Sequence, residues 1–246
     1  MDGIKEAIEY IVKMAKEAEE PQIIDIYGKE YSKEKLFRVD EIDKAEPIKA
    51  TTLSSLVDYI KKCRAELHDH MILQVESPTK VSLYSSLLDE RDRETLFEVN
   101  ALLPYFEYGR EYAQETFLVS LQSCFLPSEH REAVALLASN IVNTQQATYS
   151  DDGISQQAVM KTGITSKENV IVPNPVTLIP YRTFLEVEQP ASAFVFRISE
   201  SRSEPAFKLV DADGGLWKSQ AVHNVKEYLV NALADIPNRE QITIIA

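Results

Sequence analysis

The sequence predicts an α+β protein in which antiparallel β-sheets are covered by about five helices. Up to residue 142, segments with the 3.6-residue period of a helix alternate with short β-branched runs. Residues 143–203 are instead rich in Thr, Ser, Gln, Val and Phe and are punctuated by prolines, which is typical of successive strands. We therefore expect a β-rich C-terminal half that ends in a long helix and a short strand.

The first helix is expected over residues 1–20. Ile4, Ile8 and Ile11 lie on one stripe of this segment, and its charged residues fall elsewhere on the helix surface. Pro21 ends the pattern, because proline cannot continue a helix. The sequence thus predicts an amphipathic helix at the N-terminus.

A β-hairpin is predicted next, with strands at 22–27 and 31–39 on either side of a glycine-containing turn. The polar stretch 40–49 then has the composition of a linker or long loop. We divide the chain accordingly into an N-terminal helix and hairpin, 1–45, and a main α+β domain, 46–246. The alternative is one continuous domain over the whole chain.

The middle of the chain predicts one helix and three strands. Thr52 is a suitable N-cap for a helix over 53–63, where apolar residues recur at intervals of three and four. Residues 71–75 and 80–87 are predicted strands, and a third strand is expected through 96–99.

Two helices are predicted at 115–126 and 129–142, separated by a proline and a capping serine. A strand around 207–210, a turn and a long helix from Trp217 complete the main domain. The tail 241–246 is unusually apolar for a terminus. It is expected to pair with a sheet of its own chain or with a neighbouring subunit, because a free end of this composition would aggregate.

Composition restricts the environment and the partners. The formal net charge is −13, which opposes extensive contact with the phosphate backbone of a nucleic acid. No secretory signal and no apolar run of membrane-spanning length are visible, so a cytoplasmic location without membrane contact is expected. Cys63 and Cys124 lie in predicted helices without a redox motif, and we expect both to be reduced packing residues.

The sequence contains no phosphate-binding loop, dinucleotide fingerprint, nucleophile elbow or zinc-protease motif. With only seven glycines, it has little material for a loop that cradles phosphate. No cofactor is expected and no catalytic residue is assigned. Enzymatic activity is uncertain, and a non-enzymatic role is favoured.

Two segments contain residues that could bind metal. His68, Asp69 and His70 are ligand types that zinc or iron accepts, but their spacing at the junction of a helix and a strand does not favour a site. Asp211 and Asp213 precede two glycines, as at the start of a calcium loop, but the later ligands of such a loop are missing. We therefore expect a tight turn there and assign no metal site.

A candidate ligand-binding cluster lies in the C-terminal half, where arginine, lysine, amide and aromatic residues occur close together. Such residues can hold a phosphate and stack against a base. The assigned residues are Gln156, Lys161, Asn174, Tyr181, Arg182, Phe184, Arg197, Trp217 and Lys218. The alternative is a sheet whose aromatic residues form a core while Arg182 and Arg197 point outward.

Several segments carry a resemblance to a known family. They are LVDYIKK (Leu56–Lys62), SPTKVSLYS (Ser77–Ser85), FLVSLQSCF (Phe117–Phe125), DDGISQQAVMKTGI (Asp151–Ile164), VPNPVTLIPYRTFLEVEQPASAFVFRI (Val172–Ile198) and DADGGLWK (Asp211–Lys218). With the apolar tail, they resemble proteins encoded by phages and prophages of Gram-positive bacteria, similar to the YfdQ-like prophage family of unknown function. The resemblance implies expression in the cytoplasm of an infected or lysogenic host, but it supplies no catalytic residues.

The leading hypothesis is a phage-encoded, non-enzymatic binding protein that acts against host defence. It would sequester a nucleotide immune signal or block a defence protein, and it would be a homo-oligomer. One alternative is an accessory protein of phage DNA replication or recombination. Another is a metal-dependent hydrolase of a small phosphorylated metabolite.

Overall fold

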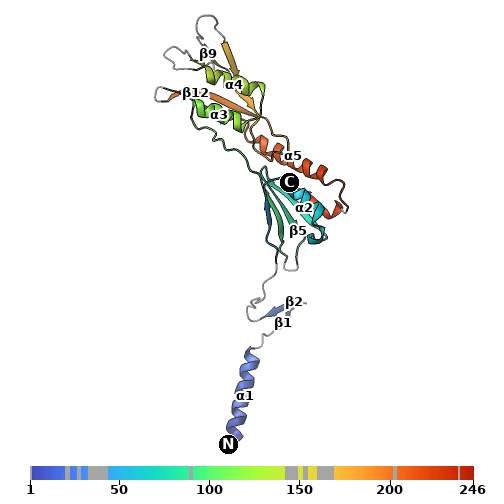
Figure 1. Cartoon of the computed structure of the whole chain (residues 1–246). Helices are drawn as coiled ribbons and strands as arrows, with labels where there is room; N and C mark the ends of the chain where they lie inside the picture. The colour runs from blue at the N-terminus through green and yellow to red at the C-terminus, as the bar shows by residue number, and fades with distance from the viewer. Residues whose placement is uncertain are drawn as a thin grey trace. The chain divides into compact units, whose positions relative to one another are not determined.

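The chain divides into two compact units, Met1–Lys44 and Ala45–Ala246, and each is described on its own (Figure 1). The computed structural model describes residues 2–19, 23–26, 29–32, 44–88, 91–141, 149–151, 155–159, 169–201, 204–237 and 239–246. Its helices and sheets form the predicted α+β architecture, with a long helix and a short strand at the C-terminus.

The first unit consists of a helix and a hairpin. Helix α1 spans Asp2–Glu19, and strand β1 (Ile23–Ile26) pairs antiparallel with β2 (Lys29–Ser32). Both predicted elements are therefore present, although the predicted second strand was longer and its residues 33–39 lie outside the described part. The predicted turn residues Tyr27 and Gly28 also lie outside it.

A five-stranded mixed sheet forms one half of the second unit, in the order β14-β4-β5-β6-β3. Its members are β3 (Ile48–Ala50), β4 (Met71–Ser77), β5 (Lys80–Ser85), β6 (Thr95–Asn100) and β14 (Ile242–Ile245). The three central strands are antiparallel neighbours, whereas β3 and β14 pair parallel at the two edges. Strand β3 was not predicted, and it lies partly in the predicted linker. Three residues in a polar context are too few to produce a strand pattern.

The apolar tail of the chain forms edge strand β14. Ile242 pairs with Met71 of β4, and the pairing continues to Ile245 beside Gln74. The tail was expected to pair either with a sheet of its own chain or with a neighbouring subunit, and it pairs with a sheet of its own chain. The composition of the tail is consequently no argument for a neighbouring subunit.

Two helices cover this sheet and share its hydrophobic core. Helix α2 (Leu53–Lys62) contacts β6, and helix α5 (Leu216–Ala232) contacts β4, β14 and α2. Thr52 caps α2 as predicted, since its hydroxyl accepts a hydrogen bond from the Ser55 backbone N–H at 3.4 Å. The short 3-10 turns Arg64–Glu66 and Arg239–Gln241 lead into β4 and β14.

A four-stranded antiparallel sheet, in the order β11-β12-β13-β7, forms the other half of the second unit. Its strands are β7 (Tyr112–Ala113), β11 (Val176–Leu178), β12 (Ser192–Ser201) and β13 (Glu204–Asp211). Helices α3 (Gln114–Cys124) and α4 (Glu129–Asn140) pack against it and against each other. The core between them is aromatic, with fully buried side chains from Phe117, Phe125, Phe194, Phe196 and Phe207.

A small antiparallel sheet adjoins α4 and is formed by β8 (Tyr149–Asp151), β9 (Ser155–Val159) and β10 (Asn169–Pro173). The predicted Asp152-Gly153 turn lies outside the described residues, but the strands that flank it pair as a hairpin. No helix among the described residues is long and apolar enough to cross a bilayer.

Candidate ligand-binding site

A cavity of about 550 Å³ in the second unit combines aromatic and charged side chains. It lies where four separate parts of the chain meet: the irregular segment after β6, the end of α3, the segment after β11 and the turn that starts α5. Its lining consists of Leu103, Pro104, Tyr105, Phe106, Tyr108, Cys124, Tyr181, Arg182, Asp211, Gly214, Gly215, Trp217 and Lys218. Aromatic rings and charged groups therefore face the same space.

The turn between β13 and α5 forms one wall of this cavity. The Asp213 carboxylate accepts a hydrogen bond from the Gly215 N–H at 2.8 Å, and Asp211 accepts one from the Asp213 N–H at 3.3 Å. Gly214 and Gly215 have φ values of 66° and 84°, in the left-handed region that glycine tolerates. The structure confirms the tight turn that was preferred over a calcium loop.

Electrostatics reinforce this turn. Burial alone would raise the pKa of Asp213, but hydrogen bonds from Ser192 and Gly215, together with the charge of Arg182, lower it. Asp213 is accordingly anionic at neutral pH. It holds the glycine turn from which α5 begins.

Arg182 lines the cavity and is only 7% exposed. Its guanidinium forms an ion pair with Asp211 at 2.8 Å and donates to the hydroxyls of Tyr108 at 3.1 Å and Ser192 at 3.3 Å. The same group faces three rings, with centroid distances of 4.4 Å to Tyr108, 4.7 Å to Trp217 and 5.0 Å to Phe194. Arg182 thus organises the aromatic wall, and its contacts within the protein occupy it.

The surroundings of Tyr108 change the pKa of its hydroxyl. Burial raises its pKa, although the neighbouring Arg182 charge and hydrogen bond act in the opposite direction. Tyr108 therefore stays neutral. Its ring also stacks on Phe194 at 5.3 Å, which connects the cavity wall to the aromatic core.

The segment that carries Arg182 is fixed at both ends. The Gln189 side chain accepts from the Arg182 and Thr183 N–H groups at 2.9 and 3.1 Å and donates to the Phe184 carbonyl at 2.9 Å. Thr183 donates to the Pro78 carbonyl at 2.5 Å, and Phe184 is 1% exposed within the core of the five-stranded sheet. These contacts explain how an irregular segment can hold a buried cation.

A second hollow of about 800 Å³ adjoins the first and shares Pro104 and Tyr181 with it. Its wall is mainly apolar, with Leu126, Ile179, Leu185 and Val187, and its polar groups are Ser123, Glu188 and Gln189. The charged groups of the first cavity do not line it. The two hollows therefore differ in chemistry, although they share a wall.

The structure brings four of the nine assigned residues together at the first cavity: Tyr181, Arg182, Trp217 and Lys218. Lys161 lies outside the described residues. The other four assigned residues do not line the cavity. The Asn174 side chain accepts from the Phe196 N–H at 3.2 Å, and Phe184 is a core residue. Gln156 lies on β9 opposite Val172, and Arg197 lies on β12 opposite Lys208.

The four described residues among them were grouped with the cavity by sequence proximity, which strands and turns do not preserve in space. The alternative interpretation is correct for Phe194 and Phe196, which form core, but wrong for Arg182, which is buried instead of pointing outward. Sequence reasoning also missed Tyr105, Phe106 and Tyr108. The only signal was the aromatic density of residues 105–112, which lie far from the other cavity residues in the sequence.

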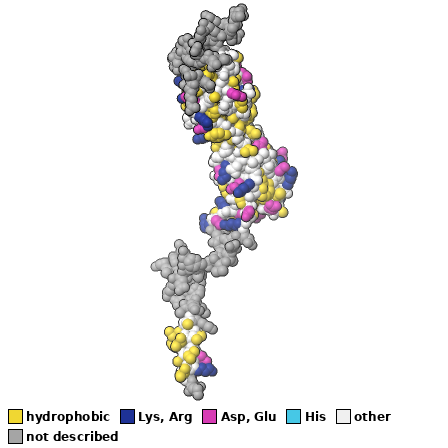
Figure 2. Space-filling view, turned by 60° about the vertical axis from the view of Figure 1, so that its left-hand side comes forward, with side chains coloured by type: hydrophobic (Ala, Val, Ile, Leu, Met, Phe, Trp, Pro, Cys, Tyr) yellow, Lys and Arg dark blue, Asp and Glu magenta, His cyan; other side chains and the backbone are white. Residues whose placement is uncertain are grey.

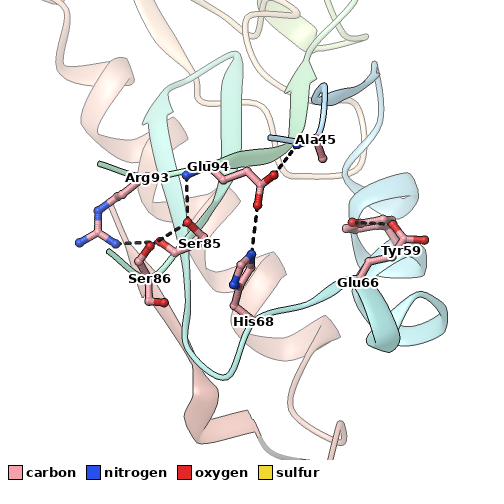
Figure 3. Close-up of polar contacts among 8 residues, drawn as sticks. All are labelled: Ala45, Tyr59, Glu66, His68, Ser85, Ser86, Arg93 and Glu94. Carbon is pink, nitrogen blue, oxygen red and sulfur yellow. Dashed lines mark hydrogen bonds and ion pairs between the residues drawn. The ribbon is translucent and has the colours of Figure 1, made fainter. Parts of the chain in front are cut away.

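His68, the first histidine of the metal candidate, has a structural partner in Glu94. His68 Nε2 lies 3.1 Å from Glu94 Oε2, and the other Glu94 oxygen accepts from the Ala45 N–H (Figure 3). The Glu94 N–H in turn donates to Ser85 Oγ at 2.9 Å. Within the part of the chain that the structure describes, no three His, Cys, Asp or Glu side chains are arranged to hold a metal ion.

Comparison with known proteins adds no assignment. No protein-family model matches the chain, and no curated protein or solved structure matches it significantly.

Proposed function

We propose that this chain is a non-enzymatic binding protein that holds a small nucleotide in the 550 Å³ cavity. The observation that carries the proposal is the convergence of aromatic and cationic side chains from three separate segments on one hollow. Cavities of this volume accommodate a drug-sized molecule. The base would lie against the aromatic residues, and the phosphate would lie near Lys218.

The aromatic side of the cavity suits a planar ring. Tyr105 lines the cavity and is 81% exposed, so its ring is accessible to a ligand. Trp217 lines the same space and is held in position by the Arg182 guanidinium at 4.7 Å. Stacking of a base on such a ring contributes about 1–3 kcal/mol and tolerates different bases.

The charged side of the cavity suits an anion. The lining has two cations, Arg182 and Lys218, and one carboxylate, Asp211, although the chain as a whole has a net charge of −13. Because Arg182 is committed to Asp211, the proposed phosphate contact is Lys218, assisted by the N-terminus of α5. That helix begins at Leu216, and its N-cap residue Gly215 provides no side-chain cap, so the helix dipole favours an anion there.

The biological setting follows from the family resemblance. In an infected bacterium, a protein that binds a nucleotide without converting it would lower the concentration of a nucleotide immune signal. Occlusion of a host defence protein by the same surface is the second form of this proposal. Both forms place the chain in the host cytoplasm.

A thermal-shift screen of the purified chain with cyclic and linear nucleotides tests the proposal. A ligand present at 100 times its Kd is expected to add about 2.7 kcal/mol of stability. Lys218→Ala should weaken binding about tenfold, because a hydrogen bond to a charged group contributes about 1.5 kcal/mol or more. The matched control is Lys226→Ala, on the same helix but outside the cavity lining, and it should leave the affinity unchanged.

Four results would replace the proposal. The absence of a shift with every nucleotide would remove the ligand, and conversion of a bound nucleotide, detected by mass spectrometry, would make the protein an enzyme. Binding to single-stranded DNA with a steep salt dependence would instead favour the replication accessory. Stoichiometric metal in the purified protein would favour the hydrolase.

A further inference from the structure

Helix α1 exposes a continuous apolar face that the ligand site does not use. Ile4, Ile8 and Ile11 are 70%, 56% and 64% exposed, and Val12 and Met14 are about half exposed at 48% and 52%. Figure 2 shows these hydrophobic side chains together on one side of α1 and charged side chains on another. The face is therefore contiguous as well as apolar.

A helix of this kind needs a covering partner. Its 18 residues span about 27 Å at 1.5 Å per residue. In proteins, most of the stability of a helix comes from packing of its apolar face. The hydrophobic face of α1 is thus both the surface to be covered and the source of its stability.

The spacing of the apolar residues matches that of a helical bundle. Ile4, Ile8, Ile11, Ala15 and Ala18 follow one another at intervals of four and three, which is the a and d pattern of a heptad. Isoleucine occupies both kinds of position, a choice that favours three or four strands over two. The positions beside this seam are also apolar and widen the face: Ala7, Val12 and Met14.

The charge of α1 favours a second copy of the chain over a membrane surface as its partner. The acidic residues of α1 are Asp2, Glu6, Glu9, Glu17 and Glu19, and the basic ones are Lys5, Lys13 and Lys16. Three positive and five negative charges give −2, whereas helices that lie on membranes are rich in Lys and Arg and are attracted to anionic lipid. A heptad seam is complementary to its own copy and needs no other protein.

We propose that α1 is an oligomerisation helix that associates with α1 of other copies in a bundle of three or more. This inference does not rest on the proposed ligand. Loss of the oligomer with retained nucleotide binding, or the reverse, would separate the two.

Mass measurement in solution on the full chain tests the bundle. The wild type should have at least three times the 27.9 kDa of one chain. The double variant Ile8→Lys/Ile11→Glu should shift it to 27.9 kDa, because it places charges in the seam without changing the net charge. The control Glu6→Lys/Lys13→Glu makes the same exchange of charges on the polar face and should stay oligomeric.

Cysteine cross-linking provides a second readout that does not depend on disrupting the helix. Ile11 lies near the middle of α1, so Ile11→Cys should meet its copy in a parallel or an antiparallel bundle and form a disulfide on mild oxidation. Lys13→Cys, on the polar face, should not, and the wild type controls for Cys63 and Cys124. A monomeric wild type, vesicle binding by α1 in place of self-association, or an oligomer that survives the seam variant without cross-linking would overturn the proposal.

Discussion

Helices α1 and α5 are almost equal in length, with 18 and 17 residues, but the apolar residues of α5 are buried in its own unit and those of α1 are exposed. In α5 the side chains of Ala221, Val225 and Leu229 are completely buried. In α1 the isoleucines of the apolar face are more than half exposed. An amphipathic pattern therefore identifies the face of a helix that will be buried, but it does not identify the partner.

The two ends of α5 also have different roles. Its first turn supplies Trp217 and Lys218 to the cavity, whereas its later turns pack on the five-stranded sheet through Val225 and Leu229. The ligand site thus depends on a helix whose position is set by the core several turns away.

The largest expected effect comes from removing core contact in α5. Leu229→Ala should lower the free energy of unfolding of the second unit by about 2–5 kcal/mol, because Leu229 is fully buried and alanine would leave a cavity. Urea denaturation followed by the fluorescence of Trp217, the only tryptophan, measures the change.

The matched substitution in α1 is Ile8→Ala. It removes an apolar side chain of the first unit that is 56% exposed in the single chain, so it should change the unfolding transition of the second unit, which Trp217 reports, by less than about 0.5 kcal/mol. Equal losses for the two variants would contradict the contrast between the helices.

A loss smaller than that of Leu229→Ala is expected where Arg182 contacts the first turn of α5. Arg182→Ala removes the ion pair with Asp211 and the cation beneath Trp217, and it should destabilise the second unit by about 2–3 kcal/mol. This value lies below that for a fully buried pair because the Asp211 side chain is 33% exposed and can be partly solvated.

Arg182→Lys is the informative control at this position. It keeps the charge but loses the planar group that contacts three rings and two hydroxyls, so it should recover only part of the stability. Full recovery by lysine would show that charge alone is needed. Thermal unfolding with intrinsic fluorescence distinguishes the outcomes.

The smallest loss expected from a change within the second unit concerns the face of the five-stranded sheet opposite its apolar core. Burial would raise the pKa of Glu76, but hydrogen bonds from Lys80, Ser82 and Tyr84 outweigh it and lower the pKa. Because the folded-state pKa is lowered, the stabilisation is present above the ordinary pKa of glutamate and is lost as the pH falls through the lowered value.

Glu76→Gln should therefore cost about 1 kcal/mol at pH 7 and progressively less in acid. Urea denaturation of both proteins at several pH values measures the difference. A difference that stays constant down to pH 3 would show that the carboxylate charge is not involved. The variant leaves the core beneath α5 intact, so it also indicates how much of the sheet's stability is independent of that helix.

The candidate site could be anticipated only in part. The motif DADGGLWK indicated the turn, and the Tyr181-Arg182 pair indicated the aromatic and cationic chemistry. Tyr105 and Tyr108 could not be connected to them, because they join the cavity only after the segment following β6 crosses to the end of β13. Phe184 was assigned to the ligand site because it lies close to Arg182 in the sequence. Its side chain belongs instead to the core of the five-stranded sheet.

By itself, the sequence determined where most helices and strands form, because caps, prolines and apolar periodicity act within a few residues. It also determined the glycine turn at Gly214 and Gly215, where only local backbone conformation matters. Tertiary structure alone decided that the C-terminal tail pairs beside β4 and that Arg182 is buried against Asp211. Strand partners and buried ion pairs depend on contacts between residues far apart in the chain, and these contacts leave no periodic trace in the sequence.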